Sequence, residues 1–254
     1  LSLESVDTFL ENLDNIKPDY VVHTVGIASV ELCEEKPDLA YQVNVMLAEN
    51  VARACALRGI RLAHISTDQL FRGDCALLDE KATVEPINTY GKTKALAEVR
   101  VQDICPEALV IRTNFYGWGP TYRQSFSDWI FYNLKMGYPI TLFNDILYTP
   151  IYIDWLVSIV HQLFDKLATG TFHVVGDERV SKYDFAMQLA STFDLDKNLI
   201  SAGSVRSQHN RVIRPEDMSL SNKKMSKELN IHVGGIKKHL LLMKQSNFSE
   251  LEAI

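Results

Sequence analysis

A tyrosine and a lysine at helical spacing could supply the proton donor of a hydride-transfer reaction. Tyr90 and Lys94 lie in the segment Asn88–Lys94, which opens a helix-like stretch of the sequence. Residues i and i+4 share one face of a helix, so the two side chains would lie together. A nearby ammonium group favours tyrosinate, and Lys94 would therefore lower the pKa of the Tyr90 phenol from about 10 toward the working range.

Two hydroxyl side chains could bind the carbonyl group that receives the hydride. Ser66 and Thr67 follow a strand-like apolar run, Leu62–Ile65, and are therefore expected at the carboxyl end of a strand. We expect Thr67 to hold the carbonyl beside Tyr90, with Ser66 as the alternative. A Tyr-x-x-x-Lys match by itself is often accidental, and a half-buried tyrosine beside a solvated lysine is the competing interpretation. The strand end upstream, and a second strand that ends in Arg112–Asn114, favour the catalytic interpretation.

The overall composition limits the classes of function. The chain of 254 residues carries a formal net charge of -6, which argues against binding to the phosphate backbone of nucleic acids. No apolar run approaches the length that spans a membrane. The four cysteines are scattered and the seven histidines show no paired ligand spacing. We therefore expect free thiols in a reducing, cytoplasmic compartment and no metal site.

Strand-like apolar runs alternate with helix-length segments in much of the chain. The expected strands are Tyr20–Val25, Leu62–Ser66, Leu109–Thr113 and Phe172–Val175, and the expected helices between them are Leu39–Arg58 and a helix that runs from Tyr90 to Ile104. Such alternation predicts an α/β fold with βαβ units and a doubly wound parallel sheet.

After Pro120 the pattern changes to helices with short connectors. These expected helices are Ser125–Met136, Asp154–Leu167, Ser181–Phe193, Ser221–Leu229 and Gly235–Met243. We predict that residues 1–120 form the sheet domain, to which residues 171–180 return. Residues 121–170 and 181–254 are expected to form a smaller, mostly helical substrate-binding lobe.

Motifs along nearly the whole chain carry a resemblance to a known family. They are Pro18–Thr24, Glu35–Ala40, Val43–Val45, Ile65–Phe71, Tyr90–Lys94, Gly170–His173, and Arg214–Pro215 with Ser219–Leu220. In this order they resemble the extended short-chain dehydrogenases/reductases, in the branch of dTDP-4-dehydrorhamnose reductase and related nucleotide-sugar proteins. The resemblance implies a Rossmann-like domain that binds NAD or NADP, and the reduction of a nucleotide-linked 4-keto sugar.

The resemblance also implies roles for individual residues. Thr67 would orient the carbonyl, Tyr90 would donate the proton, and Lys94 would assist Tyr90 and bind the nicotinamide ribose. The implied cofactor contacts are Thr24, Val25, Gly26, Asn44, Ser66, Tyr90, Lys94 and Asn114. The implied substrate contacts are Asp68, Phe115, Trp118, Tyr148 and Arg214, although Trp118 could equally pack in the core. Two departures from the family, Gln69 and Asn114–Phe115, leave the identity of the sugar open.

One element expected of such a fold is missing from the sequence. None of the 12 glycines forms Gly-x-Gly-x-x-Gly or Gly-x-x-Gly-x-x-Gly, the turn that holds the cofactor pyrophosphate at a helix N-terminus. By resemblance, the chain begins just before the helix that leads into the Tyr20 strand. We therefore expect the first strands and the phosphate loop, on the order of 40 residues, to be absent. The expected consequences are an open sheet edge and weak NAD(P) binding by this chain. The residue that would determine the preference for NAD or NADP is also expected to be absent.

Alternative functions share the same tyrosine and lysine. A nucleotide-sugar epimerase or dehydratase would use both, although Gln69 stands after Asp68 where dehydratases typically add a second acid. A third hypothesis is a non-catalytic regulatory subunit that resembles the β subunit of methionine adenosyltransferase. The expected binding partner is a nucleotide-sugar substrate. The sequence leaves open whether the chain also pairs with a second copy of itself in a homodimer.

Overall fold

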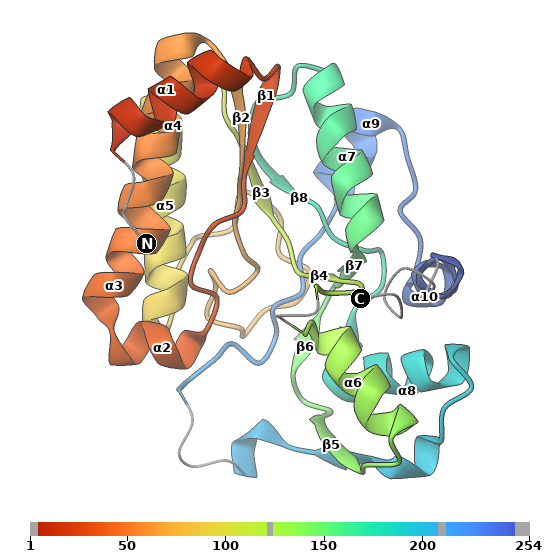
Figure 1. The fold of residues 1–254 in the computed structure, drawn as a ribbon. Helices are drawn as coiled ribbons and strands as arrows, with labels where there is room; N and C mark the ends of the chain where they lie inside the picture. The colour runs from red at the N-terminus through yellow and green to blue at the C-terminus, as the bar shows by residue number, and fades with distance from the viewer. Residues whose placement is uncertain (1–4, 121–123, 208–211, 247–254) are drawn as a thin grey trace.

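The centre of the protein is a four-stranded parallel sheet. The computed structural model describes residues 5–120, 124–207 and 212–246. Its main strands are β1 (Tyr20–His23), β2 (Arg61–Ile65), β3 (Leu109–Arg112) and β8 (Gly170–His173). They are hydrogen-bonded in the order β1-β2-β3-β8, and every neighbouring pair is parallel (Figure 1). The predicted α/β fold with a parallel sheet is confirmed, and β1 forms one edge of the described sheet.

Three helices cover one face of the sheet: α1 (Val6–Ile16), α4 (Leu47–Arg58) and α5 (Thr89–Ile104) (Figure 1). Small and branched apolar side chains of α4 and α5 pack on Leu62 of β2, and Phe9 and Leu13 of α1 pack against the same cluster. Helix α4 ends at Gly59, whose φ of 64° is the left-handed conformation that glycine adopts at little cost. These contacts fix α5, which carries Tyr90 and Lys94, against the sheet.

The other face is covered by α7 (Ile153–Asp165) and α9 (Lys223–Leu229). Their apolar side chains form a cluster with Leu109 and Ile111 of β3 and Phe172 of β8. The sequence analysis placed both helices in the substrate lobe. The structure instead places them on the sheet, because a parallel sheet buries both faces and needs helices on each.

The predicted helix over residues 39–58 is divided into three parts. After α2 (Val30–Glu35), the chain forms α3 (Pro37–Tyr41), a π-helical segment η1 (Gln42–Met46) and then α4. Such π-helical segments are rare and are often found at functional sites. Here the segment carries the buried side chain of Asn44.

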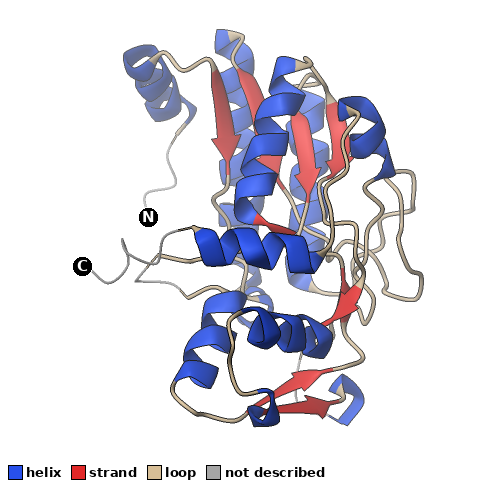
Figure 2. Cartoon of the chain, turned by 90° about the vertical axis from the view of Figure 1, so that its right-hand side faces the viewer, coloured by secondary structure: helices blue, strands red, loops and turns tan. Residues whose placement is uncertain are grey.

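Within the described residues, a second lobe contains three helices and several short strands (Figure 2). The helices are α6 (Phe126–Lys135), α8 (Lys182–Thr192) and α10 (Ile236–Gln245). The strand pairs are parallel β5 (Ile140–Phe143) with β10 (Ile200–Gly203), parallel β4 (Phe115–Tyr116) with β7 (Ile151–Tyr152), and antiparallel β6 (Leu147–Tyr148) with β9 (Val180–Ser181). Two 3-10 turns complete it, η2 (Lys197–Leu199) and η3 (Val205–Ser207). An aromatic-rich cluster around Tyr116, Phe131 and Phe185 forms the core of this lobe.

Three general features bear on the kind of protein this is. No helix within the described ranges is long and apolar enough to cross a membrane. Those ranges also contain no cluster of three or more histidine, cysteine or acidic side chains that could hold a metal ion. All four cysteines are free thiols, and only Cys75 is exposed.

Candidate active site

A cavity of about 660 Å³ lies where the carboxyl ends of β1 and β2 face the second lobe. Parallel α/β sheets bind ligands at this edge, and the volume is typical of a small-molecule pocket. The sheet domain contributes Thr24, Gly26, Ser66, Tyr90 and Lys94 to its lining. From the lobe side, the lining includes residues 115–120, 124–126 and 153.

The start of α5 is held in place by local contacts. Asn88 caps the helix by accepting a hydrogen bond of 2.8 Å from the Gly91 backbone N–H. A Cβ atom at Gly91 would lie 2.4 Å from the Gln69 carbonyl oxygen, so only glycine allows this approach. The close approach brings Tyr90 next to the chain that leaves β2. The predicted pair, Tyr90 and Lys94, is thus brought together with Ser66 in one cavity.

Lys94 is buried, and its ammonium group has defined partners. Nζ donates a hydrogen bond of 2.7 Å to the Ile65 carbonyl and lies 3.3 Å from His64 Nε2. Burial lowers the pKa of Lys94 to about 8, and the charge of Glu98 acts in the opposite direction. Lys94 is therefore mostly cationic at neutral pH, and its charge favours the ionised form of a neighbouring phenol.

An ion pair on the same helix ties α5 to the end of β3. Arg112 donates from Nη2 to Glu98 Oε2 at 2.8 Å and from Nε to both carboxylate oxygens at 3.1 Å. The side chains are only 7% and 5% exposed. The guanidinium also lies over the Phe71 ring, 5.6 Å from its centre. This pair fixes α5 relative to the strand ends, and the sequence analysis did not identify it.

The two hydroxyls after β2 are placed differently. Ser66 Oγ is buried without a hydrogen-bond partner among the described residues, and Ser66 lines the cavity. Thr67, the predicted carbonyl ligand, is not among the lining residues. Its Oγ1 donates a long hydrogen bond of 3.3 Å to Asp68 and accepts one of 3.2 Å from the Gln69 N–H. The structure thus brings Ser66 to Tyr90 and Lys94, and places Thr67 one residue further along the turn.

The predicted cofactor loop after β1 is braced by Asn44. Its Oδ1 accepts a hydrogen bond of 2.7 Å from the Ile27 N–H, and its Nδ2 donates to the Ile27 carbonyl and to Thr93 of α5. Thr24 and Gly26 line the cavity, whereas Val25 lines a second, smaller cavity. Asn44 therefore fixes the cavity wall without lining it.

The predicted substrate residues fall into two groups. Phe115 and Trp118 line the cavity, and the Trp118 indole also donates a hydrogen bond of 3.1 Å to the Met243 carbonyl. Asp68 and Tyr148 do not line it, and neither does Asn114, which was predicted as a cofactor contact. The Asn114 amide donates to Asp68 at 2.7 Å, and burial raises the pKa of Asp68 to about 6. Asn114 is thus engaged with Asp68 rather than with the cofactor side of the cavity.

Next to this group lies a lysine that sequence reasoning missed. The Lys182 ammonium lies 3.3 Å from the centre of the Tyr148 ring. Burial lowers the pKa of Lys182 to about 8, and the charge of Asp68 opposes this shift. Nothing in the pattern around Lys182, at the start of an ordinary amphipathic helix, indicated that it would approach Asp68.

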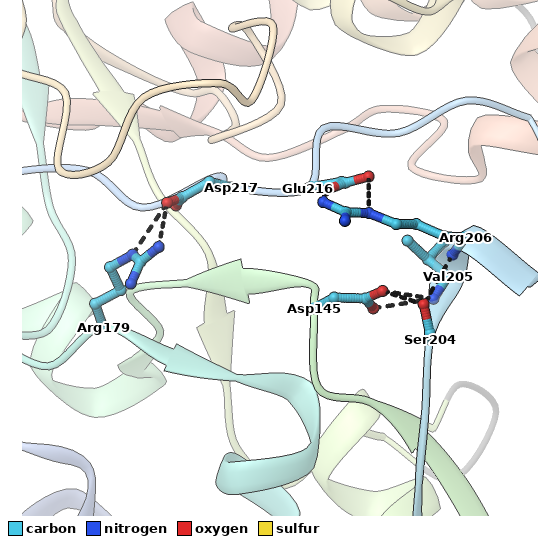
Figure 3. A network of polar contacts seen from close by, with 7 residues as sticks. All are labelled: Asp145, Arg179, Ser204, Val205, Arg206, Glu216 and Asp217. Carbon is cyan, nitrogen blue, oxygen red and sulfur yellow. Dashed lines mark hydrogen bonds and ion pairs between the residues drawn. The ribbon is translucent and has the colours of Figure 1, made fainter.

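Arg214, a predicted substrate contact, forms an ion pair across the two parts of the protein. Its Nη2 lies 2.5 Å from Oε1 of Glu31 in α2. Described residues before and after Arg214 belong to a polar network (Figure 3). In it, Arg206 pairs with Glu216, Arg179 pairs with Asp217, and Asp145 accepts hydrogen bonds from Ser204 and Val205. Arg214 does not line the cavity.

The cavity fits one half of a nicotinamide dinucleotide. Its sheet-side wall offers Ser66 Oγ without a partner among the described residues, the Lys94 ammonium and the backbone of Gly26. These groups suit a nicotinamide ribose. The described residues contain no glycine-rich turn at a helix start that would hold a pyrophosphate.

Known proteins with the same features place the chain in a family. A family model described as the RmlD substrate binding domain matches residues 1–246. The chain is 29% identical over 233 residues to the probable low-salt glycan biosynthesis reductase Agl14 of Haloferax volcanii, covering 90% of this chain and 78% of the relative. It is 28% identical over 183 residues to the dTDP-4-dehydrorhamnose reductase of Salmonella typhimurium, covering 69% of this chain and 60% of that protein. The match thus spans less than two thirds of the bacterial reductase.

A solved structure agrees with these sequence matches. The dTDP-4-dehydrorhamnose reductase of Bacillus anthracis, in complex with NADP, superposes with a TM-score of 0.90 at 25% identity, over 97% of this chain and 87% of that one. The resemblance to the rhamnose-reductase branch is therefore confirmed. The chain belongs to the RmlD substrate binding domain family.

Proposed function

We propose that the protein carries out the NAD(P)-dependent reduction of a nucleotide-linked 4-keto sugar. The observation that carries this proposal is the cavity at the carboxyl edge of a parallel sheet that Tyr90, the cationic Lys94 and Ser66 line together. The Ser66 hydroxyl has no hydrogen-bond partner among the described residues. Membership of the RmlD substrate binding domain family supports the choice of substrate class.

In this mechanism the protein positions the carbonyl and manages one proton. The bound dinucleotide supplies the hydride. Tyr90 donates its phenolic proton to the carbonyl oxygen as that oxygen becomes an alkoxide, and general acid catalysis of this kind contributes about 10²–10⁴-fold to a rate. Lys94 stabilises the phenolate that remains, because its ammonium is held in the same cavity by Ile65 and His64.

Thr67 and Ser66 divide the remaining hydroxyl roles. Thr67 does not line the cavity, so its role of orienting the carbonyl requires a local movement of the turn after β2. Its hydrogen bond to Asp68 is 3.3 Å long, beyond the usual range of O–H···O bonds, and is readily exchanged for one to the carbonyl. Ser66 lines the cavity together with Lys94, on the wall where the nicotinamide ribose would bind. Comparison of Thr67→Val with Ser66→Ala separates the roles: the first should lower kcat, and the second should mainly weaken cofactor binding. A larger loss of kcat for Ser66→Ala would transfer the carbonyl role to Ser66.

Two further parts of the proposal concern the setting of the protein. The free thiols support a cytoplasmic location, since thiols persist in a reducing compartment.

A homodimer is supported by exposed apolar side chains on two adjacent helices, Leu57 of α4 at 65% and Val99 of α5 at 53%. Light scattering should then give twice the mass of the chain, and the mass of a monomer would remove the dimer from the proposal.

The direct test is substrate-dependent oxidation of NADH and NADPH by the purified chain. With a dTDP-linked 4-keto-6-deoxy sugar, the proposal expects loss of reduced cofactor together with an equal amount of 4-hydroxy product. Because a nicotinamide-ribose half-site alone binds weakly, the cofactor is supplied at up to millimolar concentration. A 4-keto product of changed configuration, formed without net cofactor oxidation, would indicate an epimerase. No turnover at any cofactor concentration, with a changed activity of an added partner enzyme, would replace the proposal with the regulatory-subunit hypothesis.

A further inference from the structure

A short segment from the C-terminal part of the chain, residues 212–214, lies against the start of α5. Val212 packs against the buried apolar cluster that contains Tyr90. The Ile213 carbonyl accepts a hydrogen bond of 3.1 Å from Asn88 Nδ2. We call residues 212–214 the strap, because successive residues of it contact the part of α5 that carries the proposed proton donor.

The side chain of Asn88 joins the strap to the helix. Its Oδ1 accepts a hydrogen bond of 2.8 Å from the Gly91 N–H and caps α5, while its Nδ2 holds the Ile213 carbonyl. Asn88 is only 2% exposed, so water competes little for either bond. The first N–H groups of a helix have no acceptor within the helix and depend on such a cap. The strap therefore fixes the side chain that begins α5.

The third residue of the strap reaches α5 through α2. Arg214 Nη2 lies 2.5 Å from Glu31 Oε1 on α2. On the same helix, Glu34 accepts a hydrogen bond of 2.6 Å from the Thr89 N–H and one of 2.8 Å from Thr89 Oγ1. These bonds lower the pKa of Glu34, and a carboxylate is favourable at the positive N-terminal end of a helix. Arg214 thus holds α2, and α2 holds the first residue of α5.

These contacts bear directly on Tyr90, which is the second residue of α5 and lies in the turn that they hold. Proton transfer needs the phenol within hydrogen-bond reach of the carbonyl oxygen, and a displacement of about 1 Å can cost about 100-fold in rate. Just beyond the strap the chain is fixed to the second lobe, because Glu216 binds Arg206 and Asp217 binds Arg179. The strap therefore connects the second lobe to the turn that contains Tyr90.

We propose that Arg214 and Asn88 are positioning residues for the reduction, which act through the strap and α2 to hold Tyr90 where it can protonate the carbonyl oxygen; this inference rests on the proposed function. The alternative role of Arg214, binding of a substrate phosphate, needs a guanidinium that faces the cavity. Arg214 does not line the cavity, and its guanidinium is engaged by Glu31. The two roles affect different quantities. Positioning of Tyr90 acts on kcat, whereas loss of a phosphate contact weakens substrate binding and raises KM.

Substitutions at Arg214 test which quantity changes. We expect Arg214→Met to lower kcat about fivefold, the rate equivalent of about 1 kcal/mol, and to leave KM for the nucleotide sugar and the affinity for dTDP alone unchanged. Exchange of the two charges, Arg214→Glu with Glu31→Arg, should restore most of kcat. The control Arg58→Met removes an arginine from a pair of similar exposure, 37% and 53%, and should change kcat by less than about twofold. A raised KM and a lost affinity for dTDP at parental kcat would overturn the proposal in favour of phosphate binding.

A second measurement keeps the test independent of catalysis. Asn88→Ser retains a good helix cap, but the shorter side chain does not reach the Ile213 carbonyl, so the bond to the strap is lost. Hydrogen exchange followed by mass spectrometry should show faster exchange of residues 88–94 in Asn88→Ser and Arg214→Met, and parental exchange in Arg58→Met. Parental exchange in both strap variants, or parental kcat of both in an active enzyme, would overturn the proposal. Faster exchange in variants of a parent that reduces no sugar would instead remove the proposed function and leave the strap as the element that holds α5.

Discussion

Removal of the Glu98 carboxylate should destabilise the protein far more than removal of a surface carboxylate. In Glu98→Ala, Arg112 stays buried with its charge uncompensated, because its guanidinium makes three hydrogen bonds to Glu98 and is 7% exposed. Breaking a buried pair from one side costs about 3–5 kcal/mol. The matched control is Glu49→Ala, which removes the exposed i,i+4 partner of Arg53 on α4 and should cost about 0.3–0.5 kcal/mol.

Urea denaturation followed by circular dichroism measures both effects. With a slope of about 2–3 kcal/mol per molar urea, Glu98→Ala should lower the unfolding midpoint by roughly 1–2 M, whereas Glu49→Ala should leave it nearly unchanged. Replacement of both members, Glu98→Leu with Arg112→Met, should recover most of the loss, because no buried charge then remains. A loss below about 1 kcal/mol for Glu98→Ala would show that Arg112 reaches water or another anion, and would refute this account of how α5 is fixed.

Three further predictions follow from the same contacts. Lys94→Met should raise the free energy of unfolding at pH 7 by up to about 3 kcal/mol, because the pKa of Lys94 falls from 10.5 to about 8 on folding and the folded state binds this proton less tightly. The stability of the parent should therefore rise between pH 8 and pH 10.5, and the variant should lack this rise. Urea titrations at pH 7 and pH 10 measure the difference, and an equal pH dependence in both proteins would contradict it. Gly91→Ala should lower the free energy of unfolding by about 1–3 kcal/mol and lower turnover, since its Cβ would lie 2.4 Å from the Gln69 carbonyl oxygen. The control is Gly137→Ala, where nothing lies within 4 Å of the added Cβ and only the strain of a φ of 76° remains. Thermal unfolding and kcat of both variants test this, and equal stability losses would count against it. A thiol reagent at pH 8 should modify Cys75 rapidly and the other three cysteines slowly, because those three are buried and burial raises their pKa. Mass spectrometry that finds Cys55 labelled as fast as Cys75 would disprove this.

The sheet could be predicted from sequence because its strands are short apolar runs bounded by polar turns. The expected strands over residues 20–25, 62–66, 109–113 and 172–175 all exist and differ from the observed ones by one or two residues at their ends. The assignment of α7 and α9 failed for a different reason. Helical periodicity shows that a helix has one apolar face, but it does not show which surface that face covers.

The active-site pair followed from spacing, whereas its neighbours depended on packing. Tyr90 and Lys94 share a helix face at i and i+4, so their meeting is local. His23 and His64 are 41 residues apart and meet only because β1 and β2 pair in one register. In the sequence each histidine stood in an apolar run and looked simply packed. Lys182 reached Tyr148 in the same way, through the pairing of β6 with β9.

The placement of Thr67 shows a limit of motif reasoning. Both Ser66 and Thr67 follow β2, and the motif does not show which of them faces the cavity. That depends on how the chain turns after the strand, where the Gln69 N–H donates a hydrogen bond to Thr67.

The most direct test of the central claim is the rate of reduction by Tyr90→Phe. The substitution removes only the phenolic oxygen, and because Tyr90 is 9% exposed its ring should stay packed in place. In single-turnover experiments with saturating NAD(P)H and a nucleotide-linked 4-keto sugar, hydride transfer should slow by about 10²–10⁴-fold or more, while calorimetric affinities for cofactor and sugar nucleotide stay close to those of the parent. A Tyr90→Phe protein that reduces the sugar at the parental rate would contradict the assignment of Tyr90 as the proton donor.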